Sequence, residues 1–467
     1  MNPDPIIISD PFIGQVEYLA HLTSPEIGRK IPFTEIKFHE GDIDVDILER
    51  AIAYLVKRHE SLRTIFPKID GVIRQVILPY EQAKFGLEVV DASVQGSASG
   101  LFRRKYYEDA VKSFADPGRG PLVRFFLFKL AKESYLVSMI IHHVICDAWS
   151  VGVLKNEMEA SYQAYAGGKQ PSLDPMPMQL RDYCREKNDY ITSNLGMLSG
   201  FWKSRLRDYD EMVEVARFYR TYSIRHNDPS FAQKAPVFTD RSAFLQALNR
   251  QRMAASFVVY AGPGIFTGIK QLARRSGCSI STVLYASLYI FIFLYTGKRR
   301  VLLASLVADR FKSEYCSLVG CLLGGIYLPM EIGEHTLIGG LLERTFTNFE
   351  ENAGCIINNH TILGIDGHEA RMNCDIYLNY IFVGHRLDRN SVVAKPGHKV
   401  IDDAYYAVNC KIDEYSDDLS LDWEYNSGLF TGPLIEDMSR YHLAILGYLA
   451  GHGTGSVRDV ANHLARK

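Results

Sequence analysis

The apolar run Leu136–Ile141 is followed at once by two histidines, and this is the most informative pattern in the chain. Polar residues 132–134 precede the run. A short apolar run that begins after such a turn signal is typical of a buried strand. The earlier apolar segment Leu122–Leu130 predicts its hairpin partner. Because side chains alternate along a strand, His142 and His143 should point in opposite directions at its end.

Other segments have the spacing of amphipathic helices. Apolar residues recur at helical intervals over Ile47–Val56, after Asp44, which can cap the helix. Ser150–Tyr165 predicts a helix stopped by Gly167. The very apolar Ile280–Tyr295 predicts a buried helix. Two further helices are predicted at Met178–Tyr190 and Leu195–Leu206.

The remaining pattern is that of an α/β protein. Ser61–Phe66 and Val72–Leu78 predict a hairpin, and later strands are predicted at Ala255–Tyr260, Arg300–Val307, Asp375–Phe382, Tyr405–Ile412 and Leu419–Tyr425. The Gly/Pro-rich stretch Gly167–Pro177 indicates a domain boundary. We therefore expect two related lobes, residues 1–170 and 177–467, each with helices packed on a mixed sheet. A ligand site between the lobes is the natural expectation.

Composition narrows the functional classes. The 467 residues are 47% apolar and 23% charged, with a net charge of −2, which does not favour a nucleic-acid surface or a basic membrane patch. The eight cysteines form no C-x-x-C pair, so neither a zinc site nor a disulfide framework is indicated. The start, Met1–Pro5, is not a signal peptide. The most apolar run, Val283–Tyr295, is too short to span a bilayer. We expect a cytoplasmic protein that binds neither nucleic acid nor a membrane.

The segment after the histidines can be interpreted in two ways. A neutral imidazole at the end of a rigid strand is suited to accept or orient a proton near neutral pH, and Asp147 lies four residues after His143. Alternatively, the histidines serve packing and Asp147 caps the next helix. A metal site is less favoured, because adjacent strand residues diverge whereas metal ligands must converge.

Two motifs give the chain a resemblance to the condensation domains of nonribosomal peptide synthetases. The family signature H-H-x-x-x-D-G is present as His142–Ala148, and the family segment R-H-E-x-L-R-T-x-F is matched in full by Arg58–Phe66. Weaker similarities are found at Gln179–Tyr183, Val307–Arg310 and Val319–Leu328. The resemblance extends from about the first helix to about Leu449.

This resemblance implies a fold and an activity. The fold would be two chloramphenicol acetyltransferase-like lobes in a V-shaped arrangement with a tunnel between them. Family members join an acyl thioester, held on the phosphopantetheine arm of a carrier protein, to an acceptor amine. The resemblance places His143 at the tunnel centre as base or orienting group, and it pairs Asp147 with Arg310.

On this basis we predict the catalytic residues His143, His142 and Asp147. The residues expected to support the site are Arg310, Ala148, Trp149, Ser150 and Gly324. Two of them depart from the family pattern. Ala148 stands where Gly is usual, so its methyl group could narrow the acceptor's approach. Gly324 stands where Asn is usual, which removes a hydrogen-bonding side chain.

The chain contains no carrier-protein L-G-G-x-S segment and no adenylation signature. We therefore expect either a free-standing enzyme or a domain of a larger synthetase, and the start at Met1 slightly favours the first. We expect no tightly bound cofactor, and the expected partners are a carrier protein acting in trans and a small amine. One alternative is an ester-forming acyltransferase that uses an alcohol acceptor. Another is a non-catalytic domain that recruits partner enzymes. The motif histidines and Asp147 favour catalysis.

Overall fold

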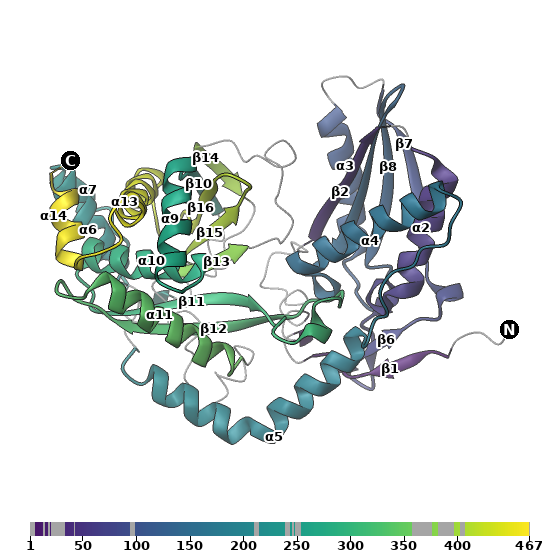
Figure 1. The fold of residues 1–467 in the computed structure, drawn as a ribbon, viewed down its shortest axis with the longest axis horizontal. Helices are drawn as coiled ribbons and strands as arrows, with labels where there is room; N and C mark the ends of the chain where they lie inside the picture. The colour runs from purple at the N-terminus through teal and green to yellow at the C-terminus, as the bar shows by residue number, and fades with distance from the viewer. Residues whose placement is uncertain are drawn as a thin grey trace. The chain divides into compact units, whose positions relative to one another are not determined.

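A computed structural model of the chain describes residues 5–12, 15, 16, 19, 33–41, 43–93, 99–209, 214–238, 243, 244, 247, 254–356, 376–381, 397–401 and 407–466. The chain divides into two compact units, whose elements are labelled in Figure 1. Unit 1 comprises Met1–Asn194 and Ala308–Leu323, and unit 2 comprises Leu195–Val307 and Gly324–Lys467. This division differs from the predicted lobes, because residues 177–194 and 308–323 belong to unit 1.

Unit 1 is built on a four-stranded mixed sheet. Its strands, in spatial order, are β2 (Phe33–Gly41), β9 (Ser134–His142), β8 (Val123–Ala131) and β7 (Leu87–Asp91). The pairings of β9 with β2 and β8 are antiparallel, whereas β7 and β8 are parallel. The predicted hairpin of β8 and β9 is therefore confirmed.

Smaller elements complete unit 1. Its short strands are β1 (Ile7–Ser9), β6 (Gln75–Ile77) and β3 (Thr64–Ile65) in one sheet, with β4 (Lys68–Ile69) and β5 (Val72–Ile73) in another. Its helices are α2 (Val45–Arg58), α3 (Ser99–Ser113), α4 (Ala148–Ala166) and the first part of α5 (Leu180–Leu206).

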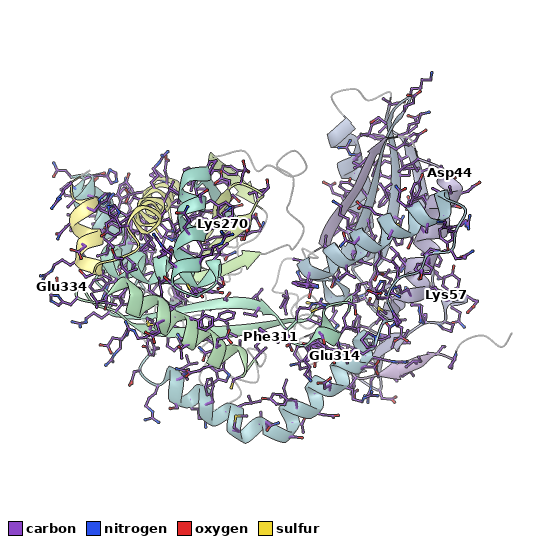
Figure 2. All side chains as sticks on the ribbon, viewed as in Figure 1. Asp44, Lys57, Lys270, Phe311, Glu314 and Glu334 are labelled. Atoms are coloured by element: carbon purple, nitrogen blue, oxygen red, sulfur yellow. The ribbon has the colours of Figure 1, made fainter. Side chains whose placement is uncertain are left out.

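Helix α2 forms where the apolar spacing and the capping residue Asp44 predicted a helix. The carboxylate of Asp44 accepts a hydrogen bond from the Ile47 N–H and caps the first turn. Lys57 lies in the last turn, where a cation interacts favourably with the helix dipole. Figure 2 shows these two residues at opposite ends of the helix. The face between them is buried through Leu48, Ala51, Ile52, Leu55 and Val56.

One face of the four-stranded sheet is covered by aromatic packing from α3. Tyr106 and Tyr107 each lie edge-on to Phe126 and Phe128 of β8, at ring distances of 5.8–6.3 Å. The Tyr107 hydroxyl also lies 3.0 Å from the Ser138 hydroxyl of β9. These contacts fix β9 laterally, so the residue that ends the strand has a defined place.

Two sequence-based predictions of elements were wrong. Ser61–Phe66 is not one strand: residues Glu60–Arg63 form a 3₁₀ turn, and only Thr64–Ile65 pair with β6. Leu62 is buried although it lies in this turn, so its apolar side chain gave the same sequence pattern as a buried strand residue. The helices predicted at Met178–Tyr190 and Leu195–Leu206 are a single helix, α5, because no proline interrupts it.

Unit 2 contains a seven-stranded mixed sheet. Its strands, in spatial order, are β12 (Leu323–Glu331), β11 (Arg300–Ala308), β13 (Ile376–Ile381), β15 (Val408–Glu414), β16 (Leu419–Asn426), β10 (Ala254–Tyr260) and β14 (Gly397–Ile401). β13 is parallel to β11 and β15, whereas β16 is antiparallel to β15 and β10. The helices are α6 (Val215–Arg225), α7 (Pro229–Ala232), α9 (Pro263–Arg275), α10 (Ile280–Thr296), α11 (Ile338–Ala353), α13 (Gly432–Gly451) and α14 (Val457–Leu464).

Helix α10 lies in the core of unit 2, as its composition predicted. Most of its residues are buried among those of α9, α11, α13 and the sheet. Within the described part of the chain, no single helix is long and apolar enough to cross a membrane. α9 and α10 meet that test only as a pair, with a bend of 106° between them.

The segment 308–323, between β11 and β12, is anchored to α5. Asp309 accepts a hydrogen bond from the Tyr183 hydroxyl (3.1 Å) and forms an ion pair with the Lys187 ammonium (2.5 Å). Lys312 forms an ion pair with Glu186, which lies one turn after Tyr183 on α5. These contacts hold the segment in unit 1, where it reaches the residues that follow β9.

Candidate active site

Strand β9 delivers the two histidines to different surroundings. His142 ends the strand and is fully buried, with its ring edge-on to Phe114 at 6.0 Å. Its Nδ1 accepts a hydrogen bond from the Val144 N–H (3.0 Å). Burial, and then the neighbouring His143, lower the pKa of His142 to about 3. A buried neutral imidazole that accepts a backbone N–H supports the turn of the chain at this point.

Asp147 caps α4 and is itself completely buried. Its Oδ1 accepts hydrogen bonds from the Ser150 N–H (2.8 Å) and the Ser150 hydroxyl (2.7 Å). Its Oδ2 accepts one from the Leu322 N–H (3.1 Å). The capping interpretation of the sequence is therefore correct for this residue, and the carboxylate also binds the 308–323 segment.

Arg310 supplies the positive charge for Asp147. Its Nη2 lies 2.9 Å from each carboxylate oxygen, and its side chain is 4% exposed. Its Nη1 donates to the carbonyls of Tyr315 and Leu318, both at 2.6 Å. A buried carboxylate is tolerated only when paired and hydrogen-bonded, and here both conditions hold. The pairing implied by the family resemblance is present in the structure.

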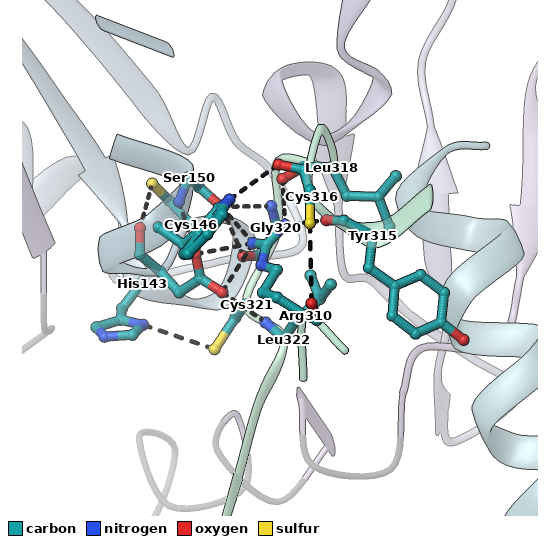
Figure 3. A network of polar contacts seen from close by, with 12 residues as sticks. His143, Cys146, Ser150, Arg310, Tyr315, Cys316, Leu318, Gly320, Cys321 and Leu322 are labelled. Carbon is teal, nitrogen blue, oxygen red and sulfur yellow. Dashed lines mark hydrogen bonds and ion pairs between the residues drawn. The ribbon is translucent and has the colours of Figure 1, made fainter. Parts of the chain in front are cut away.

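Ser150 and Gly320 complete the network, which is drawn in Figure 3. The Ser150 hydroxyl lies 2.9 Å from the Gly320 carbonyl and 3.0 Å from its N–H, while the Asp147 N–H donates to the same carbonyl (3.2 Å). A Cβ on Gly320 would lie 2.5 Å from the Leu180 Cδ1 and 2.9 Å from the Leu322 Cδ1, so both leucine side chains would have to move to accommodate a larger residue. The start of α4 is thus joined to the 308–323 segment by many short contacts.

His143 lies at the edge of this network and keeps part of its surface exposed. Its Nδ1 is 3.7 Å from the Cys321 sulfur, and Figure 3 shows its other ring nitrogen directed away from Cys321. Desolvation lowers the pKa of His143, although a hydrogen bond to its own backbone and the nearby Asp147 charge oppose the shift. The imidazole is therefore neutral at neutral pH, and a neutral imidazole can accept a proton.

The cysteines of the site are poor nucleophiles. Burial raises the pKa of the Cys146 thiol well above its usual value, and it raises the pKa of Cys321 to about 12. The thiolate is the nucleophilic form, so these thiols are unreactive at neutral pH. Cys146 is fully buried and fills space beside Asp147. The site therefore offers an imidazole for proton transfer.

The other predicted supporting residues have distinct places. Trp149 donates its indole N–H to the Cys316 carbonyl (2.8 Å), which adds another bond between α4 and the 308–323 segment. Ala148 is the first residue of α4 and is partly exposed. Gly324 belongs to unit 2, outside this network, and lies against Ile356.

Gly320, Cys321 and Leu322 were not singled out from the sequence, and neither were Tyr315, Cys316 and Leu318. The first three lie in the segment that resembles a family motif, but only Gly324 and Gly325 departed visibly from that motif. Cysteine spacing gave no signal for Cys321. Among the residues that the structure describes, no group of three or more His, Cys, Asp or Glu side chains is arranged to hold a metal ion.

Comparison with known proteins identifies the family of this chain. The family model "Condensation domain" matches residues 33–349. A linear gramicidin synthase of Brevibacillus parabrevis is 22% identical over 444 residues, which is 90% of this chain and 8% of that protein. Isonitrile lipopeptide synthase of Mycobacterium tuberculosis is 26% identical over 320 residues, 66% of this chain and 12% of that protein. The chain therefore spans a small part of these relatives.

Solved structures show the same fold. The condensation domain from the Monacolin K polyketide synthase MokA has a TM-score of 0.72, with 15% identity and coverage of 97% of this chain and 100% of that one. The X-domain from teicoplanin biosynthesis has a TM-score of 0.71, with 16% identity and coverage of 96% of each chain. SgcC5 from Streptomyces globisporus has a TM-score of 0.66, with 18% identity and coverage of 94% of this chain and 99% of that one.

Proposed function

This chain belongs to the condensation-domain family, and we propose that it transfers an acyl group from a thioester to an amine in the biosynthesis of a natural product. The observation that carries the proposal is the partly exposed, neutral imidazole of His143, supported by the buried network around Asp147. That arrangement supplies one proton acceptor. The similarity to a linear gramicidin synthase and to an isonitrile lipopeptide synthase supports the assignment.

The reaction needs little more than that acceptor. The neutral amine nitrogen attacks the thioester carbonyl carbon, and a tetrahedral intermediate forms. The His143 Nε2 takes the proton that the amine nitrogen loses, the carbon–sulfur bond breaks, and the sulfur leaves as a thiolate. Transfer of the proton to that sulfur gives an amide and a thiol. Holding both reactants in place supplies much of the acceleration, and the base adds to it.

The acyl donor we propose is a thioester on the phosphopantetheine arm of a carrier protein. Two observations favour a thioester as the donor. A thioester is already activated, and the thiols of the site are too weakly ionised to form an acyl-enzyme. A small amine is the proposed acceptor. In this scheme Asp147 and Arg310 position the segment that carries His143, and they do not touch the reactants.

The proposal is tested with a panel of acyl thioesters and amines, by measuring thiol release and product mass. We expect amine-dependent release, and we expect His143→Ala to reduce turnover by about 100- to 10,000-fold, the usual contribution of a general base. Full turnover in His143→Ala would exclude the proposed role. The matched control is His335→Ala, an exposed histidine of unit 2, which should retain turnover.

Two alternatives are outcomes of the same experiment. Release that yields an ester, with an alcohol in place of the amine, would identify the acceptor as a hydroxyl. The solved X-domain from teicoplanin biosynthesis forms a complex with OxyB and also shares this fold. Tight binding of a partner enzyme, without consumption of any soluble or carrier-bound thioester, would therefore identify a recruiting domain.

A further inference from the structure

We propose that the seven-stranded sheet of unit 2 carries a binding site for a positively charged nitrogen group, formed by Asp422 and Glu424 of β16 and Ser256 of β10. Its role is to select a donor or an acceptor that bears a second, basic nitrogen. The inference rests on the proposed function for that role only, because binding of the cation can be measured without any reaction.

The strand register places these residues on one face of the sheet. β16 lies between β15 and β10 (Figure 1), and Lys411 of β15 is directly opposite Asp422. On the other side of β16, Ser256 is directly opposite Glu424. Opposite residues point to the same side, and the side alternates along each strand. The intervening residues, such as Trp423, belong to the core packed by the helices, so the polar residues occupy the other face.

Negative charge exceeds positive charge on this face. Within β10, β15 and β16, which the structure describes, it carries the carboxylates of Asp413, Asp422 and Glu424 but only one ammonium, that of Lys411. The Lys411 Nζ lies 3.1 Å from an Asp413 oxygen. Burial opposes the charge on Lys411, but the carboxylates around it outweigh burial and raise its pKa. The three carboxylates outnumber this ammonium, so the face attracts a further cation.

Two buried polar groups flank Glu424 and have no hydrogen-bond partner within the described residues. The Ser256 side chain is fully buried, and its hydroxyl makes no hydrogen bond. Asn409 is 8% exposed and donates its Nδ2–H to Glu424 (2.8 Å), which leaves its Oδ1 as an acceptor without a donor. A buried polar group without a partner costs free energy, and a ligand that brings N–H donors removes that cost.

An alkylammonium group matches both the charge and the acceptors. Burial raises the pKa of Glu424, although the hydrogen bond from Asn409 opposes the shift, so the fold by itself disfavours the Glu424 carboxylate. An ammonium has three N–H donors, enough for Glu424, the Asn409 Oδ1 and the Ser256 hydroxyl. Asp422 and Glu424 each keep part of their surface exposed, which leaves a ligand access. The described carboxylates do not form a group that could hold a metal ion, so an organic cation fits better.

The first test measures binding by calorimetry, with no acyl donor present. The probes are cadaverine, a linear diamine that is protonated at neutral pH, and pentanediol, its uncharged analogue. We expect the wild type to prefer cadaverine, and Glu424→Gln to weaken cadaverine binding by roughly tenfold or more, as for the loss of a hydrogen bond to a charged group. Lys411→Gln removes a competing cation and should tighten binding. Glu350→Gln, on the exposed side of α11, is the matched control and should bind as the wild type does.

Thermal unfolding separates loss of binding from loss of the fold. Because the free protein disfavours the Glu424 charge, Glu424→Gln should have a Tm equal to or above that of the wild type. Ser256→Ala removes only one acceptor and should weaken cadaverine binding with little change in Tm.

Turnover shows which reactant carries the basic nitrogen. Aminohexanoyl and hexanoyl thioesters are compared as donors, and cadaverine and pentylamine are compared as acceptors. We expect a lower KM for the charged member of one pair, a preference that Glu424→Gln removes and Glu350→Gln keeps. The proposal is overturned if the wild type binds cadaverine no better than pentanediol, or if Glu424→Gln keeps the preference. Absence of turnover with every pair would contradict the proposed function instead, and the binding data would still decide whether the cation site exists.

Discussion

A Cβ atom placed on Gly324 would lie 2.0 Å from the Cγ2 of Ile356. No side chain fits at that distance, so Ile356 occupies the space that any residue other than glycine would need at position 324. The asparagine that the family resemblance led us to expect there is replaced by a pair: a glycine, and an isoleucine that packs over it.

Because of this pair, we expect the stability of a variant with a side chain at position 324 to depend on the residue at position 356. Gly324→Asn should destabilise the protein by about 1–3 kcal/mol, the usual cost of overpacking, and Ile356→Ala in the same chain should recover part of the loss. Denaturant unfolding measures both. Gly340→Ala, on α11 with open space around it, is the control and should be neutral or stabilising. Equal stability of Gly324→Asn and the wild type would contradict the clash.

Removing the positive charge beside Asp147 should strongly lower the free energy of unfolding. Arg310→Met leaves a buried carboxylate without its partner, which we expect to cost about 3–5 kcal/mol of unfolding free energy. Arg310→Lys should recover little, because one ammonium cannot bind Asp147 and also the carbonyls of Tyr315 and Leu318. Arg440→Ala removes an exposed ion pair with Glu436 and should change stability by less than about 1 kcal/mol. Similar values for Arg310 and Arg440 would refute the argument from burial.

Stability should fall as the solution becomes acidic. Burial holds the pKa of His442 at about 3, below the value of about 6.5 expected in the unfolded chain. Between these two values the unfolded chain binds a proton that the folded chain does not, so the free energy of unfolding decreases as pH falls through this window. His142 behaves in the same way.

The direction of this pH dependence of stability can be measured at His442. The His442 Nε2 lies 2.8 Å from the Ser287 hydroxyl, a contact that His442→Gln can replace. Unfolding free energies measured at several pH values should show a shallower slope in His442→Gln, by up to about 1.4 kcal/mol per pH unit. An unchanged slope would show that this histidine takes up no extra proton on unfolding.

The rate should respond to pH through His143. Desolvation lowers the pKa of this imidazole, and the charge of Asp147 opposes the shift. Its neutral form is the base, so kcat should fall only when the pH drops below the ordinary histidine range. The profile is measured at a fixed concentration of neutral amine. A loss of rate centred at or above the ordinary value would contradict the shift.

Ala148 should influence the acceptor. It is partly exposed at the first turn of α4, directly after Asp147, and it stands where the family usually has glycine. We expect Ala148→Gly to lower KM for bulky amines several-fold and to leave kcat nearly unchanged. Ala160→Gly, exposed on the same helix, carries a similar helix-propensity cost and should leave KM unchanged. A shared effect in both variants would indicate helix stability as the cause.

The sequence predicted those parts of the site that lie in continuous segments. The β8–β9 hairpin and α10 have continuous apolar runs, α2 and α4 have apolar residues at helical spacing, and the structure confirms each of them. The 3₁₀ turn at Glu60–Arg63 was missed because its buried residues mimic a short strand. α5 was divided because its middle is polar.

The contacts made by the 308–323 segment could not be predicted from local pattern. Arg310 was expected beside Asp147 only through the family resemblance, since 163 residues separate them. Cys321 was not found at all, because a cysteine in an apolar segment has no distinguishing pattern. Its relation to His143 depends on a return of the chain to unit 1, which periodicity does not encode.

That return of the chain has a consequence for synthesis. The ribosome completes Asp147 long before it completes Arg310, so during elongation the first 194 residues have no guanidinium for a carboxylate that the finished fold buries. Closing so long a loop also costs chain entropy, which slows the formation of this contact. A fragment ending at Asn194 should therefore be unstable, and adding a peptide of residues 308–323 should stabilise it. The active-site support is thus completed late, once the second half of the chain has emerged.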